Sequence, residues 1–121
     1  NLAELELIAG WFKIFANDED RVQWLKEKFS IDTIIVTKGG DGALLYMNDQ
    51  FYHHKGYKVD VADTVGSGDA FLAGFISKLI ENAQPEEALD FASGLGAFIA
   101  SRSGACPYYE IKEVYDLMGR R

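Results

Sequence analysis

A short stretch, DTVGSGD at residues 63–69, places two glycines, a serine and an acidic residue at the start of an apolar run. The first N–H groups of a helix have no partner within the helix, and glycines let a ligand approach the backbone closely. We therefore expect Gly66, Ser67 and Gly68 to form an anion site suited to phosphate. Asp69 falls in the first turn, where the helix dipole stabilises a carboxylate. Such a carboxylate can orient an alcohol for phosphoryl transfer, because a loose transition state needs positioning more than a strong base.

The same stretch also has a purely structural interpretation. A glycine turn, an acidic first turn and an apolar stripe occur together in any well-capped helix, and local chemistry alone favours this alternative. Other motifs fit less well, because the dinucleotide pattern G-x-G-x-x-G breaks at Phe71 and a G-x-S-x-G nucleophile turn would need glycine instead of Val65. We therefore expect neither nicotinamide binding nor serine hydrolase chemistry.

A second candidate stretch, VTKGGDG at residues 36–42, follows a β-branched run. Ligands of open α/β sheets gather at the carboxyl ends of strands, where Thr37 and Lys38 could meet a phosphate. The alternative is a tight hairpin turn, which needs glycine in any case, and the residues alone favour the turn. Similarly, the small residues within 85–101 are explained by close helix packing.

Composition limits the class of protein. The chain has 121 residues, 48% of them hydrophobic, which is typical of one globular domain. Its 12 basic and 19 acidic residues give a charge of −7, which argues against a nucleic-acid partner. No apolar run is long enough to span a membrane, so we expect a soluble protein. The lone Cys106 fits a reducing cytoplasm. His53 and His54 are neighbours in the sequence and so point to opposite faces of a strand, which makes them a poor pair of metal ligands.

Hydrophobic periodicity predicts an α/β layer architecture. Two opening helices precede the strands, and Asp18 is a candidate N-cap for the second. Apolar residues of the helix after Gly68 form one wide stripe that we expect to be packed: Phe71, Leu72, Phe75, Ile76, Leu79 and Ile80. Strands are expected over 31–37, 43–47 and 51–59, and further helices over about 69–80, 85–101 and 110–118.

These stretches resemble the motifs of a known family. DTVGSGD resembles the D-T-x-G-A-G-D signature of the ribokinase-like (PfkB) carbohydrate kinases, with Ser67 in place of the usual alanine. VTKGGDG resembles the family's V-T-x-G-x-x-G nucleotide loop, and Asn1 with Glu4 resembles its N-x-x-E motif. The resemblance covers residues 1–121 but only the carboxyl-terminal part of the family fold. It implies a layered α/β fold in which helices flank a mostly parallel sheet with an antiparallel edge, and it puts most sugar contacts and the lid upstream.

The resemblance also implies a role for each matching residue. Asp69 would be the catalytic base, and the amides of Gly66, Ser67 and Gly68 would form the anion hole. Residues expected along ATP are Thr37, Lys38, Gly39, Gly42, Gly68, Ala92, Ser93 and Gly96. The residues expected at cations are Asn1 and Glu4 for Mg²⁺ through water, and Asp63, the Val65 carbonyl and the loop 99–108 for a monovalent ion such as K⁺.

The activity that the resemblance implies is ATP-dependent phosphorylation of a sugar hydroxyl. The two glycine motifs look most like those of fructokinases. A ribokinase, a keto-deoxy sugar acid kinase or a nucleoside kinase would present nearly the same sequence. An alternative from another class of function is a nucleotide-binding fragment without catalysis. We expect the isolated segment to be inactive. The expected partners are a sugar and ATP, with a homodimer and a cytoplasmic location as further expectations.

Overall fold

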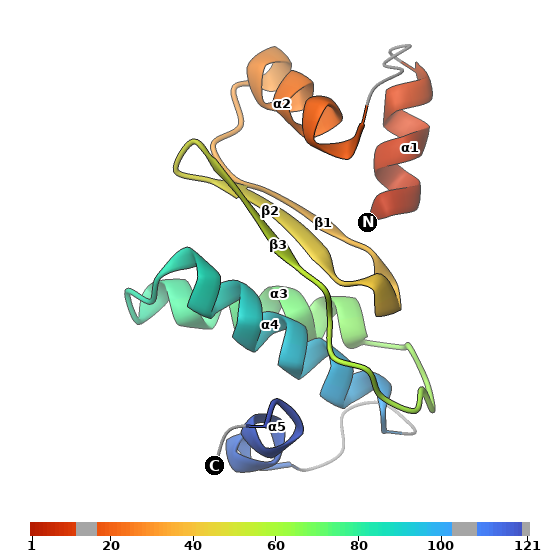
Figure 1. Cartoon of the computed structure of the whole chain (residues 1–121), viewed down its shortest axis with the longest axis vertical. Helices are drawn as coiled ribbons and strands as arrows, with labels where there is room; N and C mark the ends of the chain where they lie inside the picture. Colours follow the sequence, from red (N-terminus) through yellow and green to blue (C-terminus); the bar gives the residue numbers. More distant parts are fainter. Residues whose placement is uncertain (12–16, 103–108, 120–121) are drawn as a thin grey trace.

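The computed structural model describes residues 1–11, 17–102 and 109–119, which form stacked layers (Figure 1). A three-stranded sheet lies between α1 and α2 on one face and α3 and α4 on the other, and α5 packs outside α4. The elements are α1 (Leu2–Trp11), α2 (Asp18–Phe29), β1 (Ile34–Thr37), the 3-10 turn η1 (Gly39–Asp41), β2 (Ala43–Met47), β3 (Gln50–His54), α3 (Ser67–Ile80), α4 (Pro85–Ala100) and α5 (Ile111–Leu117). Within these ranges no helix combines the length and apolar composition that a bilayer crossing requires.

The sheet has the strand order β1-β2-β3, and both pairs are antiparallel. The glycine turn η1 brings Ala43 opposite Thr37, and the second hairpin brings His54 opposite Ala43. The resemblance implied a mostly parallel sheet with an antiparallel edge, whereas the described strands form antiparallel pairs alone. The third strand ends at His54, earlier than the expected 59, and residues 55–61 continue without regular structure.

The central strand β2 is buried on both faces, and its alternating side chains divide the core in two. Leu44 and Tyr46 pack with Val22 in the cluster beneath α1 and α2. Ala43 and Leu45 face the other way, toward α3 and α4. Full burial of an aliphatic or aromatic side chain contributes about 1.5–3 kcal/mol, so this strand anchors both layers.

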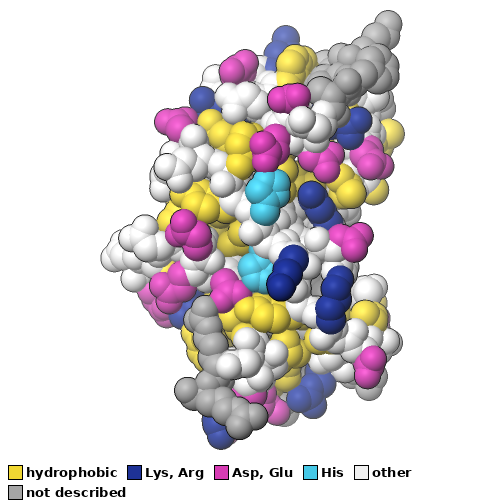
Figure 2. Space-filling model, viewed as in Figure 1, with side chains coloured by type: hydrophobic (Ala, Val, Ile, Leu, Met, Phe, Trp, Pro, Cys, Tyr) yellow, Lys and Arg dark blue, Asp and Glu magenta, His cyan; other side chains and the backbone are white. Residues whose placement is uncertain are grey.

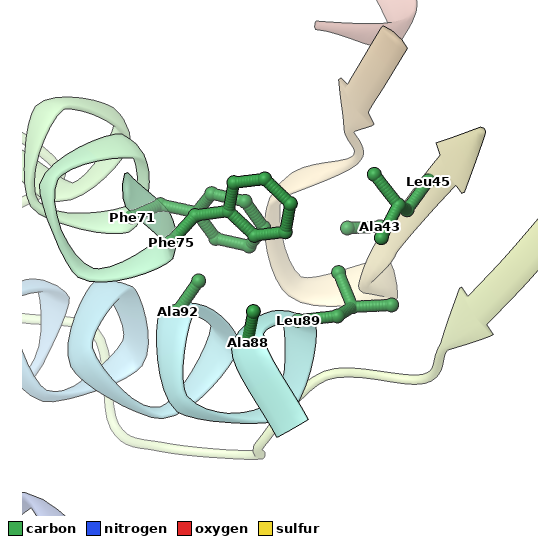
Figure 3. Close-up of a cluster of buried hydrophobic side chains, with 7 residues drawn as sticks. All are labelled: Ala43, Leu45, Phe71, Phe75, Ala88, Leu89 and Ala92. Atoms are coloured by element: carbon green, nitrogen blue, oxygen red, sulfur yellow. The ribbon is translucent and has the colours of Figure 1, made fainter. Parts of the chain in front are cut away.

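The second cluster joins the sheet to the helices that carry the candidate site (Figure 3). Phe71 and Phe75 of α3 meet Leu89 and Ala92 of α4 beneath Leu45. Only this half of the α3 stripe is buried. The expectation that the whole stripe packs is wrong for its other half within the described structure, because these residues lie about 100° around the helix from the buried half and stay exposed: Leu72, Ile76 and Ile80.

Small residues allow α4 to approach its neighbours closely, as the packing interpretation predicted. A Cβ atom on Gly94 would lie 2.3 Å from Met118 Sδ, just beyond α5. A Cβ atom on Gly74 would lie 3.0 Å from Leu95 Cδ2, at the contact between α3 and α4. Both glycines therefore set the distance between helices.

Two local features hold the helices in place. The N-cap of α2 is Asn17, whose Oδ1 accepts the Asp20 N–H at 2.8 Å, so the cap lies one residue before the expected Asp18. Lys78 of α3 joins three helices, because its ammonium lies 4.8 Å from the centre of the Phe91 ring and beside Tyr115 of α5. A hydrogen bond with Tyr115 raises the pKa of Lys78 above its ordinary value; desolvation opposes this, and Glu81 adds to the rise.

Candidate functional site

A cavity of about 180 Å³ opens where the glycine turn, the start of α3 and the end of α4 meet. Four segments line it: the turn after β1, the connection from β3 to α3, the first turns of α3, and the second half of α4. The lining residues are Thr37, Gly39, Gly40, Gly42, Gly56, Tyr57, Val59, Val61, Thr64, Ser67, Gly68, Phe71, Ser93, Gly96, Ala97 and Ala100. Seven of these were expected along a nucleotide or its phosphates: Thr37, Gly39, Gly42, Ser67, Gly68, Ser93 and Gly96.

The turn after β1 forms the first wall. The Lys38 N–H donates to the Gly42 carbonyl at 2.8 Å, which closes the turn. Gly42 has φ 98°, and a Cβ atom there would lie 1.8 Å from the His54 carbonyl oxygen, so only glycine fits. The Lys38 ammonium lies 3.6 Å from Asp18 at the start of α2, and Lys38 is not a lining residue. The cavity is therefore bounded here by backbone and by Thr37.

The N-terminus of α3 forms the second wall. Gly66 caps the helix in the left-handed region at φ 82°, and the Ser67 N–H and hydroxyl both donate to the Thr64 carbonyl, at 3.2 and 2.9 Å. The N–H groups of Gly68 and Asp69 precede the first intrahelical donor and so have no partner in the helix. Asp69 lies exposed in this first turn, as expected, and forms no ion pair with another described residue. The Gly68 amide thus lies at one end of the cavity, and the Asp69 carboxylate lies in the same helical turn without lining the cavity.

Helix α4 forms the third wall and carries a buried polar atom without a partner. Ser93 is 7% exposed, and its Oγ makes no hydrogen bond within the described structure. The side chain lines the cavity, so a bound molecule can supply the missing hydrogen bond. A Cβ atom on Gly96 would lie 3.2 Å from the Ser67 carbonyl oxygen, so this glycine serves both the lining and the contact with α3. Ala92, expected at the nucleotide, points instead into the hydrophobic cluster and is fully buried.

Of the residues expected at cations, Ala100 of the loop 99–108 lines the cavity, whereas Asn1, Glu4, Asp63 and Val65 are not lining residues. Asn1 Oδ1 accepts the Glu4 N–H at 2.9 Å and so caps α1. Asp63 Oδ1 accepts the Val65 N–H at 3.0 Å, and the Ala100 carbonyl accepts the Asp63 N–H. Across 1–11, 17–102 and 109–119, no three His, Cys, Asp or Glu side chains gather as metal ligands. The roles of these residues at Mg²⁺ and K⁺ stay predictions, and no chemical step is assigned to either ion.

Two parts of the expected sites need separate mention. Most of the loop 99–108, expected near the monovalent ion, lies outside the described residues, as does Cys106. The segment 56–61 was missed, although Gly56, Tyr57, Val59 and Val61 all line the cavity. The alternation Val59-Asp60-Val61 was the sequence signal for this segment, since side chains two residues apart lie on the same side of an extended chain, which puts both valines on one side.

Comparison with known proteins identifies the family. Residues 1–112 match the family described as pfkB family carbohydrate kinase. An ATP-dependent ribose-1-phosphate kinase of Halopiger xanaduensis is 37% identical over 107 residues, which are 83% of this chain and 36% of that protein. A fructokinase of Escherichia coli is 32% identical over 108 residues, covering 84% of this chain and 34% of that protein.

A solved structure agrees with these sequence matches. The crystal structure of a ribokinase from Thermotoga maritima superposes with a TM-score of 0.83 at 28% identity, covering 98% of this chain and 40% of that one. The fold is thus that of a ribokinase-like α/β protein, which confirms the expected fold class. The chain belongs to the pfkB family of carbohydrate kinases. It spans about a third of the length of the curated relatives it matches.

Proposed function

We propose that residues 1–121 are the nucleotide-binding and catalytic part of an ATP-dependent sugar kinase. One observation carries the proposal. A single cavity connects the unpartnered Ser93 hydroxyl on α4 with the free amides at the start of α3, and Asp69 lies in that same first turn. A molecule with a polar heterocycle at one end and phosphates at the other matches these two ends. The name of the Halopiger relative, an ATP-dependent kinase, supports ATP as that molecule.

The proposed chemistry follows from the charges at the α3 N-terminus. The amides of Gly68 and Asp69, which have no partner in the helix, would hold the transferred phosphoryl group as negative charge develops on it. Asp69 would orient the sugar hydroxyl and accept its proton as the oxygen attacks the γ-phosphorus. The bond between that phosphorus and the β–γ bridging oxygen would break, and ADP would leave. Ser67 in place of alanine is compatible with this role, since its hydroxyl and its N–H both donate to the Thr64 carbonyl and leave the amides of Gly68 and Asp69 free.

For the substrate, we propose fructose. The family resemblance of the two glycine motifs and the similarity to the E. coli fructokinase both favour it. The Halopiger relative makes ribose 1-phosphate the second candidate. The described cavity walls are mostly backbone, alanine, valine and glycine, so we propose that sugar selection rests on residues outside 1–121.

The test replaces the proposed base in the full-length protein that carries these residues. Asp69→Asn keeps the side-chain shape but cannot accept the proton, so sugar-dependent ADP release should fall by at least about 10²-fold. The dissociation constant for ATP should change less than about threefold, because the amides of the same turn remain. Asp60→Asn is the matched control, since Asp60 is an exposed acid in the adjacent segment and does not line the cavity.

The assay measures ADP release against fructose, ribose, ribose 1-phosphate and nucleosides. Turnover of Asp69→Asn close to that of the wild type would sink the proposed role of Asp69. Failure of the wild type to bind ATP would sink the proposed function as a whole. A preference for ribose 1-phosphate would overturn the fructose assignment and leave the kinase chemistry standing.

A further inference from the structure

A partly buried histidine links the segment 56–61, which lines the cavity, to helix α4. His54 is the last residue of β3, and its Nε2 lies 2.8 Å from Asp90 Oδ1 on α4. The Gly56 N–H donates to the other ring nitrogen, Nδ1, at 2.9 Å. The Tyr57 hydroxyl donates to the same oxygen of Asp90, and its ring lies against the imidazole at 5.2 Å between centres. One carboxylate and one imidazole thus tie two successive wall residues to the helix.

The hydrogen bonds determine which nitrogen carries the proton. Nδ1 accepts from a backbone N–H, so the neutral imidazole carries its hydrogen on Nε2 and donates it to Asp90. Both side chains are largely buried, with exposed fractions of 16% for His54 and 20% for Asp90. Neither residue lines the cavity, whereas Gly56 and Tyr57 do. Any effect of the pair on a bound molecule must therefore pass through the wall.

Other contacts also support this part of the wall. Gly56 has φ 83°, and a Cβ atom there would lie 3.2 Å from the Gly40 oxygen, so this point of the wall rests directly on the glycine turn. Lys58 adds a hydrogen bond from its ammonium to the Gly40 carbonyl at 2.8 Å, but it is exposed. Tyr57 packs against the buried cluster between α4 and α5, and the backbone just after the segment reaches the end of α4 through the Ala100 carbonyl. His54 and Tyr57 add to these a hydrogen-bonded attachment to the side chain of Asp90.

We infer that His54 and Asp90 are positioning residues for the nucleotide. They fix the wall formed by Gly56 and Tyr57 at the distance from α4 that the bound nucleotide requires. This inference rests on the proposed function, because it assigns ATP to the cavity. The neighbouring His53 has no such role, since it lies on the opposite face of β3 and pairs with Glu19 of α2.

The experiment uses the full-length protein and compares four variants. His54→Ala removes both hydrogen bonds of the imidazole. His54→Asn keeps an oxygen near the Nδ1 position for the Gly56 N–H but is too short to reach Asp90. His54→Gln places an amide nitrogen near the Nε2 position and can restore the bond to Asp90. His53→Ala is the matched control on the same strand.

The expected result is a selective loss of nucleotide affinity. The dissociation constant and KM for ATP should rise about tenfold in His54→Ala and about threefold in His54→Asn. His54→Gln should recover most of the affinity, and the KM for the sugar should stay within about twofold throughout. His53→Ala should match the wild type in every constant.

Three outcomes would overturn the inference. Unchanged ATP affinity in His54→Ala, at an undiminished melting temperature, would show that the wall needs no attachment. Equal changes in the KM for ATP and the KM for sugar would show a general structural role. Should His54→Ala fail to fold, an ATP affinity in His54→Asn equal to that of the wild type would refute it. If the wild type itself bound no ATP, the proposed function would fall first, a result distinct from any of these.

Discussion

Ser93→Ala should change stability and nucleotide affinity in opposite directions. In the unliganded protein the buried hydroxyl has no partner, and such a group costs about 1–3 kcal/mol of stability. Water that enters the cavity offsets part of this cost. We therefore expect removal of the Ser93 hydroxyl to stabilise the protein by about 1 kcal/mol, the low end of that range. Alanine also has the higher helix propensity, worth up to about 0.5 kcal/mol. The free energy of unfolding should therefore rise by about 1–1.5 kcal/mol, the sum of these two contributions.

In the proposed ATP complex the balance should reverse. The hydroxyl would then donate to or accept from the nucleotide, and loss of such a bond costs about 0.5–1.5 kcal/mol net, or roughly 2- to 12-fold in the dissociation constant. Calorimetric titration with ATP and urea unfolding of the same samples measure the two effects. Ser77→Ala is the matched control, because Ser77 is an exposed helical serine of α3 whose replacement changes propensity alone. An unliganded Ser93→Ala protein that is less stable than Ser77→Ala, or an unchanged dissociation constant, would refute the reasoning.

Two further predictions concern the glycine turn and the stability of the protein at alkaline pH. Gly42→Ala should lower the free energy of unfolding by about 2 kcal/mol or more, because of strain at positive φ and the clash with the His54 carbonyl. Gly40→Ala should leave the free energy of unfolding nearly unchanged, because its Cβ atom would meet nothing within 4 Å. Urea unfolding compares the two variants, and equal midpoints would contradict the argument. The pKa of Lys78 is raised in the folded state, so its pairing with Tyr115 stabilises the folded protein. This stabilisation is fully present below the unfolded pKa of 10.5 and is lost as the pH rises through the folded pKa. Tyr115→Phe should thus have a lower free energy of unfolding than the wild type at pH 8, and the difference between the two proteins should narrow by pH 11. Unfolding curves at the two pH values that give the same difference would contradict this prediction.

Sequence patterns were sufficient for most of the elements. The β-branched run that ends at Thr37 and the glycine-rich start of α3 carry strong local signals, and both stretches line the cavity, while the role of the second as an anion loop stays a prediction. The small-residue helix was harder. Successive residues of a helix differ by about 100° in direction, so composition alone could not distinguish Ser93, which faces the cavity, from Ala92, which faces the core.

The attachment of the wall illustrates what sequence could not supply. His54 and Asp90 are separated by 36 positions, and their contact exists only because α4 returns beneath the end of β3. Nothing in the local pattern around His54 indicates a partner, and a histidine two residues before a glycine is typical of an ordinary strand end. Pairings of this kind depend on the packing of whole layers and become visible only in three dimensions.

The burial of α4 has a thermodynamic consequence. Besides lining the cavity, this helix gives buried side chains to the cluster under the sheet and to the cluster with α5. A molecule that binds along it favours the arrangement that both clusters also require, so occupancy and folding are linked equilibria. Cavity-creating substitutions deep in either cluster should accordingly weaken binding without touching the ligand, and ligands should be detectable by the melting temperature alone.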